Sequence, residues 1–169
     1  MNFAVCAMVL AVLAASGCGP SSSPPATAGG TPTQTLQGFE MQDIKNGEKS
    51  MSLHAEEGKL YEEQHYADLT KPVVTFFKHG RASSVMTAPL GRVDTQTRAV
   101  QGWGGVKVVT ADSTTLTTDR LAYDPAKRQI FSKDAVTIEK PDSITRGKGL
   151  LSDPEMKSVR ILHQRARMK

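Results

Sequence analysis

The chain has 169 residues, of which 22% are charged and 5% are aromatic, and its formal net charge is +4 at pH 7. With so few aromatic residues, the positive charge is better explained by an anionic lipid surface, or by solubility alone, than by nucleic acid. The two cysteines, Cys6 and Cys18, both lie near the N-terminus, so the rest of the chain has no thiol for a disulfide, a metal site or nucleophilic catalysis.

The N-terminus resembles a bacterial lipoprotein signal. Thirteen apolar residues, 3–15, precede Ser16-Gly17-Cys18, a length typical of a signal-peptide core and too short for an ordinary membrane-spanning helix. We therefore predict that residues 1–17 are a signal peptide and that Cys18 is lipidated as the mature N-terminus. Two features depart from this pattern: Ala15 stands where Leu is commoner, and no Lys or Arg precedes Lys45. The alternative is an uncleaved N-terminal anchor.

Residues 18–35 are rich in Pro, Gly, Ser and Thr and contain no charged residue. Such a composition cannot bury a core, and it predicts a flexible tether. Fully extended at about 3.1 Å per residue, the tether would reach roughly 50 Å. The folded domain is accordingly predicted over residues 36–169.

The domain has an all-β pattern from end to end, without an amphipathic helix. Residues 73–77 form a strongly β-prone run whose inward side chains are either Val74 and Phe76 or Val73 and Phe77. Further along, glycines surround Trp103, the only tryptophan. Trp103 is either a core or rim aromatic beside a glycine bulge, or part of the lining of a lipid-holding interior.

Residues 114–138 are predicted to form three short strands, because apolar residues recur there with a period of two. Asp124-Pro125 supplies a tight turn, and the polar pair Lys133-Asp134 separates the second strand from the third.

This pattern recurs along the chain. Residues 50–60 match residues 83–93 at an offset of 33, and further offsets of 30 and 29 lead to Leu116 and Thr145. Turns recur at Asp94, Asp124 and Asp153. Periods near thirty with internal strand signals indicate stacked or rolled β units.

The sequence contains no recognisable catalytic motif. The four histidines lack metal-type spacing, and neither a G-x-S-x-G elbow nor a phosphate-binding loop is present. We therefore expect no enzymatic activity, no metal and no cofactor.

Two segments carry a family resemblance: T-x-L-x-T-D-x-L-x-Y-D at residues 114–124 and G-x-G-L at residues 147–150. Together with the tethered N-terminus, they resemble LptC, the periplasmic component of lipopolysaccharide export, over residues 39–162. The resemblance implies a folded-over antiparallel sheet, the β-jellyroll or β-taco, with an apolar trough. It implies a carrier that receives lipopolysaccharide from the LptBFG transporter and passes it to an LptA-like bridge.

LptA-like bridge proteins share this architecture, so the assignment to LptC rests partly on the membrane tether. Familiar LptC proteins have a transmembrane anchor, and a lipoprotein would depart from them. We expect a periplasmic protein anchored at the inner membrane, but Gly19, which follows Cys18 where an Asp would retain the protein there, leaves the outer membrane open. The remaining alternative is a purely structural β-repeat lipoprotein without lipid cargo.

Two sets of site residues follow. The final strand, near residues 158–164, is expected to present an unpaired edge to the bridge, with Val159, Ile161 and Arg165 as partner-edge residues. The candidates for lining the trough are Phe76, Trp103, Val106, Val108, Leu116, Tyr123, Val136 and Ile138.

Overall fold

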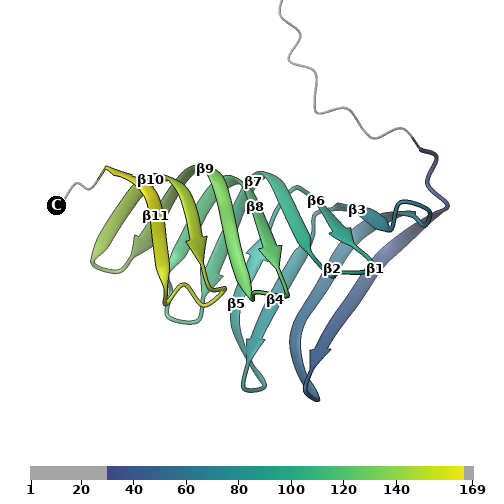
Figure 1. Cartoon of the computed structure of the whole chain (residues 1–169), viewed down its shortest axis with the longest axis horizontal. Coiled ribbons are helices and arrows are strands. Elements are labelled where there is room, and N and C mark those ends of the chain that lie inside the picture. Colours follow the sequence, from purple (N-terminus) through teal and green to yellow (C-terminus); the bar gives the residue numbers. More distant parts are fainter. Residues whose placement is uncertain (1–29, 166–169) are drawn as a thin grey trace, which may run out of the picture.

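The computed structural model describes residues 30–165, which form eleven strands of one antiparallel sheet (Figure 1). The predicted all-β, folded-over sheet is confirmed, and within this range no apolar helix of membrane-spanning length is present. The strands are β1 (Gln34–Lys45), β2 (Glu48–Tyr61), β3 (Tyr66–Thr70), β4 (Val73–Lys78), β5 (Arg81–Thr87), β6 (Leu90–Asp94), β7 (Val100–Thr110), β8 (Thr115–Asp124), β9 (Gln129–Lys140), β10 (Ser143–Ser152) and β11 (Val159–Arg165).

β1 begins at Gln34, two residues before residue 36, where the folded domain was expected to begin. Gln34 and Thr35 pair with β2, and the amide of Thr33 already donates to the carbonyl of Leu60 at 2.8 Å. Polar residues at a strand edge are held by backbone hydrogen bonds, which composition does not reveal.

Two strands, β2 and β7, each pair with different neighbours along their two halves. β2 pairs with β4 over residues 51–54 and with β3 over residues 57–61. β7 pairs with β5 over residues 107–110 and with β6 over residues 100–103. Because β4 pairs with β5 and β3 with β6, these six strands close into a ring of two layers. Beyond the ring, β8, β9, β10 and β11 continue the sheet from β7, and β1 extends it from β2.

The long strands fold over where their register is interrupted. Irregularities lie between Trp103 and Val106 of β7, between Thr118 and Ala122 of β8, and between Lys148 and Leu150 of β10. Positive-φ glycines occupy two of these places, Gly104 and Gly105 in β7 and Gly149 in β10. Bulges of this kind bend a strand sharply, and the line of bends is called the ridge below.

The ridge divides the sheet into two wings. The β5 wing contains β4 and β5 and residues 51–54, 106–110, 115–118, 136–140 and 143–147. The β6 wing contains β3 and β6 and residues 57–61, 100–103, 121–124, 129–132 and 150–152. Across the bend of β8 the buried positions change from Leu116 and Thr118 to Leu121 and Tyr123, so both halves of the strand direct apolar side chains between the wings.

The prediction of three short strands over residues 114–138 is wrong: this stretch contains two longer ones. β8 and β9 are joined by the expected turn at Asp124-Pro125, but Lys133-Asp134 lies inside β9. The polar pair is accommodated because Lys133 is exposed at the ridge, while β8 and β10 pair with β9 on both sides of it.

The predicted aspartate turns are present. The Oδ1 atom of Asp94 accepts hydrogen bonds from the amides of Gln96 and Thr97, and that of Asp124 accepts them from Ala126 and Lys127. Asp153 accepts instead from the more distant amide of Ser158, at 2.7 Å. The first two are tight turns, whereas the third opens into a longer loop.

Candidate lipid-binding interior

One column of side chains runs between the wings from β1 to β9. Its members face one another directly in consecutive strands, and each is at most 9% exposed. In sheet order they are Met41, Leu53, Val74, Met86, Val108, Leu116 and Ile138. The repeat offsets seen in the sequence link every second member of this column, namely Leu53, Met86 and Leu116, and they lead next to Thr145, which faces Ile138.

Burial shows which residues of β4 face inward. Val74 and Phe76 are fully buried, whereas Val73 is 37% exposed. Phe76, from the β5 wing, meets the ring of Tyr123, from the β6 wing, edge-on with centroids 4.7 Å apart. The two wings thus pack directly against each other.

Seven of the eight predicted trough residues come together in this interior. Phe76, Val106, Val108, Leu116, Tyr123, Val136 and Ile138 are each at most 3% exposed and belong to one buried cluster. Burying such side chains stabilises the fold by about 1.5–3 kcal/mol each. In the described structure they fill the space between the wings with their own atoms.

Trp103 is separate from this cluster. It faces Leu90 and Arg120 in the neighbouring strands, both of which are exposed, and it lines a hollow of about 350 Å³ beside Phe131 on the outer surface. The inner position belongs to its neighbour Gly102, where an added Cβ would approach that of Ala88 to 3.0 Å. The interior is tightly packed at Gly102, and Trp103, the next residue of the strand, lies on the opposite face.

The wings meet along the side opposite the ridge, which is called the mouth. The loop between β10 and β11, residues 153–158, crosses part of the mouth and is called the strap. Pro154, Glu155 and Met156 of the strap are buried, and Met156 belongs to the apolar cluster.

A group of ion pairs and hydrogen bonds holds the strap in place. The Glu155 carboxylate, 6% exposed, lies 2.6 Å from Arg128 and 3.8 Å from Lys78. It also accepts a hydrogen bond of 3.2 Å from the hydroxyl of Ser83 in β5. Arg128 in turn donates to the carbonyl of Phe77 at 2.8 Å. Charged groups from both wings therefore close the mouth over an apolar interior.

Two buried hydroxyls near the mouth lack a hydrogen-bond partner among the described residues: those of Tyr123 and Ser84. Burial raises the pKa of the Tyr123 phenol, which also feels the charges of Arg128, Asp43 and Glu155. The phenol is therefore neutral at physiological pH. An unpaired buried hydroxyl typically costs about 1–3 kcal/mol.

The two ends of the sheet are edge strands. β1 pairs only with β2, and β11 pairs only with β10, at opposite ends of the molecule (Figure 1). Of the predicted edge residues, Val159 is 36% exposed, Ile161 packs partly against the core, and the backbone of Arg165 pairs with Arg146. The strand predicted near residues 158–164 is present as β11.

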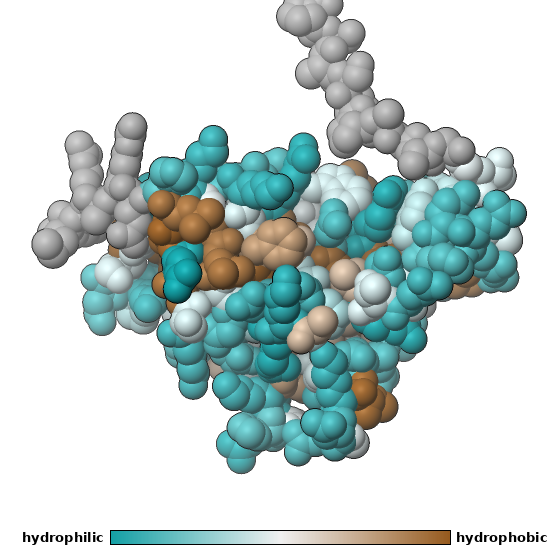
Figure 2. Space-filling view, in the orientation of Figure 1, coloured by the Kyte–Doolittle hydropathy of each residue, from teal (hydrophilic) through white to brown (hydrophobic). Residues whose placement is uncertain are grey.

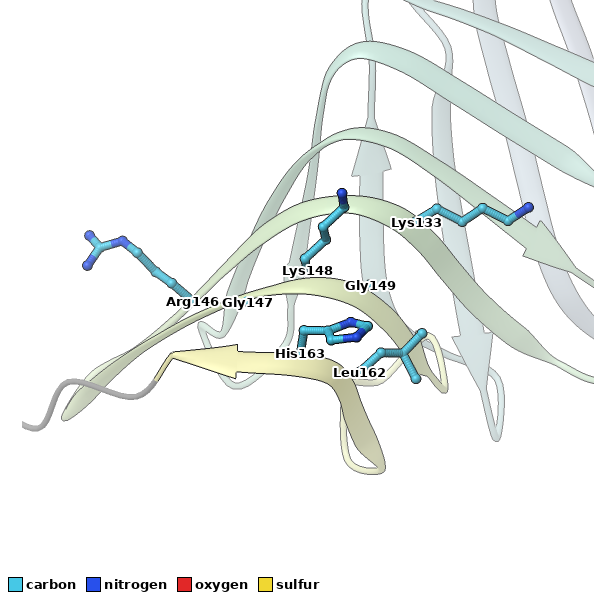
Figure 3. Close-up of a pocket in the computed structure, with 7 residues that line it drawn as sticks. All are labelled: Lys133, Arg146, Gly147, Lys148, Gly149, Leu162 and His163. Atoms are coloured by element: carbon cyan, nitrogen blue, oxygen red, sulfur yellow. The ribbon is translucent and has the colours of Figure 1, made fainter.

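The outer surface beside β11 is hollowed and partly apolar. A hollow of about 750 Å³ lies at the bend of β10, where Leu162 is 60% exposed among basic side chains. Lys148 and Arg146 project away from β10, and Leu162 and His163 lie along β11 (Figure 3). Figure 2 shows apolar surface gathered near these two strands.

Sequence reasoning missed the residues of the mouth. Arg128, Glu155 and Met156 carried no recognisable motif, because they come from two separate loops that meet only in the folded sheet. The available signal was Met156, an apolar residue inside a polar turn. Among residues 30–165, no three His, Cys, Asp or Glu side chains come together as metal ligands would. Cys18 lies outside the described residues.

Comparison with solved structures finds a similar fold in LptH of Pseudomonas aeruginosa, the LptA-homologous periplasmic component of its lipopolysaccharide transport device. The two chains are 14% identical, the TM-score is 0.53, and the match covers 70% of this chain and 90% of that one. At this identity the similarity concerns the fold. Comparison with curated proteins gave no match.

Comparison with protein families matches residues 3–168 to the family described as lipopolysaccharide-assembly, LptC-related. The match spans nearly the whole chain, including the edge strands and the strap. The chain therefore belongs to the LptC-related family of lipopolysaccharide-assembly proteins.

Proposed function

We propose that this protein is a membrane-tethered periplasmic carrier which receives lipopolysaccharide from an LptBFG transporter and passes it to an LptA-like bridge. The acyl chains would lie between the wings, against the column that contains Leu116 and Ile138. In this proposal the protein binds and transfers lipid without catalysing a reaction.

The observation that carries the proposal is the continuity of this column from the edge strand β1 to β9, together with the unpaired edges at both ends of the sheet. Apolar side chains face one another from β1 to β9, and the strands at both ends of the sheet have an unpaired edge in the described part of the chain. An unpaired edge is a template for a partner's strand. Strands added at β1 and β11 would extend the same interior into a neighbour of similar fold.

The energetics support a passive carrier. An acyl chain exposed to water costs about 0.8 kcal/mol per methylene group, or roughly 8–10 kcal/mol for a twelve-carbon chain. Val, Leu, Ile and Phe side chains between the wings could replace that water. Because the sequence has no nucleotide-binding motif, the energy for extracting the lipid would come from the transporter.

The chain must spread its wings to accept cargo, since the interior is filled in the described structure. The wings are joined at the ridge by continuous strands, but they meet at the mouth through side chains and one loop. Entry through the mouth would therefore leave the backbone pairing of the sheet intact.

The filled interior also favours a second candidate, the purely structural β-repeat lipoprotein. In that case the cluster around Phe76 and Leu116 would be an ordinary core that never opens. The two candidates differ in whether lipid ever contacts these side chains.

A photo-crosslinking experiment tests the proposal. A crosslinking amino acid at Leu116 or Ile138 should capture lipopolysaccharide when the transporter hydrolyses ATP. The matched controls are Lys107 and Arg120, exposed residues of β7 and β8, which should capture little. Equal crosslinking at the inner and outer positions would refute lipid binding between the wings and favour the structural candidate.

A further inference from the structure

Two hollows beside the strap form one basic region. The first, of about 510 Å³, is lined by Lys78, Lys127, Arg128 and Arg160 together with Asp153 and Glu155. The second, of about 310 Å³, is lined by Lys45, Lys49, Lys78, His79 and Arg128, with Glu48 as its carboxylate. Lys78 and Arg128 line both hollows, so cations outnumber carboxylates where the two meet.

Glu155 already places an anion in this region. Its carboxylate lies 2.6 Å from Arg128 and 3.8 Å from Lys78, although the side chain is only 6% exposed. The contact with Arg128 is a charge-assisted hydrogen bond, which is stronger than an ordinary one, and Lys78 adds a second positive charge nearby. The geometry shows that the two cations can hold an oxyanion at the mouth.

Apart from these ion pairs, the strap is held by the packing of Met156 and by hydrogen bonds within the loop. Its ends are fixed where Ser152 pairs with Val159, and within it the amide of Met156 donates to the carbonyl of Asp153 at 3.0 Å. Met156 has a φ of 55°, in the left-handed region that strains a residue with a side chain. The strap is thus a strained loop, closed by side-chain contacts and able to move without unpairing β10 from β11.

The apolar interior lies directly beneath the strap. Met156 belongs to the same buried cluster as Phe76 and Tyr123. Tyr123 is 1% exposed, and its hydroxyl has no hydrogen-bond partner among the described residues. Displacing the strap would uncover apolar surface immediately beside a cluster of cations. That arrangement suits an amphiphile whose anionic headgroup stays outside while its chains enter.

We propose that this basic region binds a phosphate monoester, such as the headgroup of a phosphorylated lipid, and that the phosphate replaces Glu155 against Arg128 and Lys78 so that the strap opens the mouth. A phosphate monoester carries a charge of about −1.5 to −2 and three acceptor oxygens, so it competes well with a single carboxylate. The inference rests on the proposed function, because it describes how lipid reaches the interior.

Amide hydrogen exchange of residues 153–158 in the full chain tests strap opening. The chain is mixed with phosphatidylcholine vesicles containing phosphatidic acid, or with matched vesicles containing diacylglycerol. Phosphatidic acid should accelerate exchange in the strap, and diacylglycerol should not. If inorganic phosphate alone produces the same acceleration, the phosphate site stands and its ligand is the free ion. No acceleration with either form of phosphate would overturn the inference.

Two variants separate a phosphate site from a merely structural ion pair. Glu155→Gln removes the competing charge and should tighten binding to phosphatidic acid vesicles by about tenfold, with fast strap exchange even without lipid. Lys78→Met should weaken that binding by a similar factor. Lys107→Met, which removes an exposed lysine elsewhere, is the matched control. Unchanged or weaker binding by Glu155→Gln would contradict the displacement.

The strap experiment and the crosslinking experiment can fail independently. Lipopolysaccharide crosslinked at Leu116 without a phosphate effect on the strap would defeat only this inference. Strap opening by phosphate without any crosslink at Leu116 would keep the phosphate site and defeat the proposed carrier.

Discussion

At the scale of single residues, Tyr123 combines a favourable ring with an unfavourable hydroxyl. The ring packs edge-on against Phe76, and such aromatic pairs contribute about 0.5–1.5 kcal/mol beyond their buried area. The hydroxyl has no hydrogen-bond partner among the described residues. A polar group kept at such a cost often marks a place where function limits stability.

We therefore predict that Tyr123→Phe raises the free energy of unfolding by about 1 kcal/mol, because it removes an unsatisfied polar atom and keeps the ring. The control, Tyr123→Leu, removes the ring as well and should be destabilising. Urea unfolding followed by circular dichroism measures both changes. A loss of stability in Tyr123→Phe would mean that the hydroxyl has a hydrogen-bonding partner after all.

The charge of the Asp124 carboxylate contributes to the stability of the fold. The amides of Lys127 and Ala126 donate to its carboxylate and lower its pKa, with the positive charge of Lys127 contributing as well. A pKa that is depressed in the folded state adds stability above the unfolded value, which is about 3.9. That contribution is lost as the pH falls through the folded pKa.

Asp124→Asn should accordingly lower stability at neutral pH, and its difference from the parent protein should shrink as the pH falls below about 4. Asparagine keeps an acceptor oxygen, so the turn itself should persist. Urea midpoints across a pH series measure the effect, with Asp119→Asn on the exposed ridge as control. A difference that stays constant with pH would exclude the carboxylate charge as the cause.

At the scale of elements, sequence periodicity predicted the strands of the sheet better than it predicted how the two wings meet at the mouth. The inward residues Leu116 and Ile138 follow from local alternation, and the turns at Asp94 and Asp124 follow from the turn preferences of aspartate. Bulges hide such alternation, because they change the inward parity within one strand, as between Thr118 and Leu121. A polar pair at a bend, such as Lys133-Asp134, therefore resembles a strand break.

The candidate site divides in the same way. Seven of the eight trough candidates lie in the interior, since burial follows alternation. The position of Trp103 depends on Ala88, which faces Gly102 from a distant part of the chain. Contacts among Arg128, Glu155 and Ser83 bring two loops of the β6 wing against strand β5 of the other wing and leave no local trace in the sequence.

The edge strand β11 gives a prediction at the same scale. Successive amides of an antiparallel strand point alternately to its neighbour and to the free edge. Single proline substitutions at successive residues from 160 to 163 should therefore alternate between two effects, one on partner binding alone and one on stability as well. Those at free-edge amides should weaken binding to an LptA-like protein by about tenfold and spare stability, whereas those facing β10 should also lower stability.

Pull-downs and thermal unfolding of the four proline variants measure this alternation. The control is Gln42→Pro in β1, at the opposite edge, which should affect the transporter contact and leave the bridge contact intact. If the prolines at free-edge amides leave binding to the bridge protein unchanged in folded protein, β11 is not the joint.

At the scale of the whole molecule, the sheet has a direction. The chain enters at the β1 end, and β11 lies at the other end (Figure 1). An N-terminal anchor would therefore hold the β1 end toward the membrane and leave the β11 edge for the next protein. Under this arrangement the interior column begins at the supplying side, in β1, and extends toward the receiving side as far as β9.

Either kind of N-terminal anchor would give this direction, and Cys18 is the residue that distinguishes them. Cys18→Ala should abolish metabolic labelling with palmitate and leave a precursor that still carries residues 1–17, because acylation of this cysteine precedes removal of the signal. Cys6→Ala, inside the apolar run, is the matched control and should be labelled and processed normally. Labelling that persists in Cys18→Ala would exclude the lipoprotein and favour an uncleaved apolar anchor, which would still hold the β1 end at the membrane.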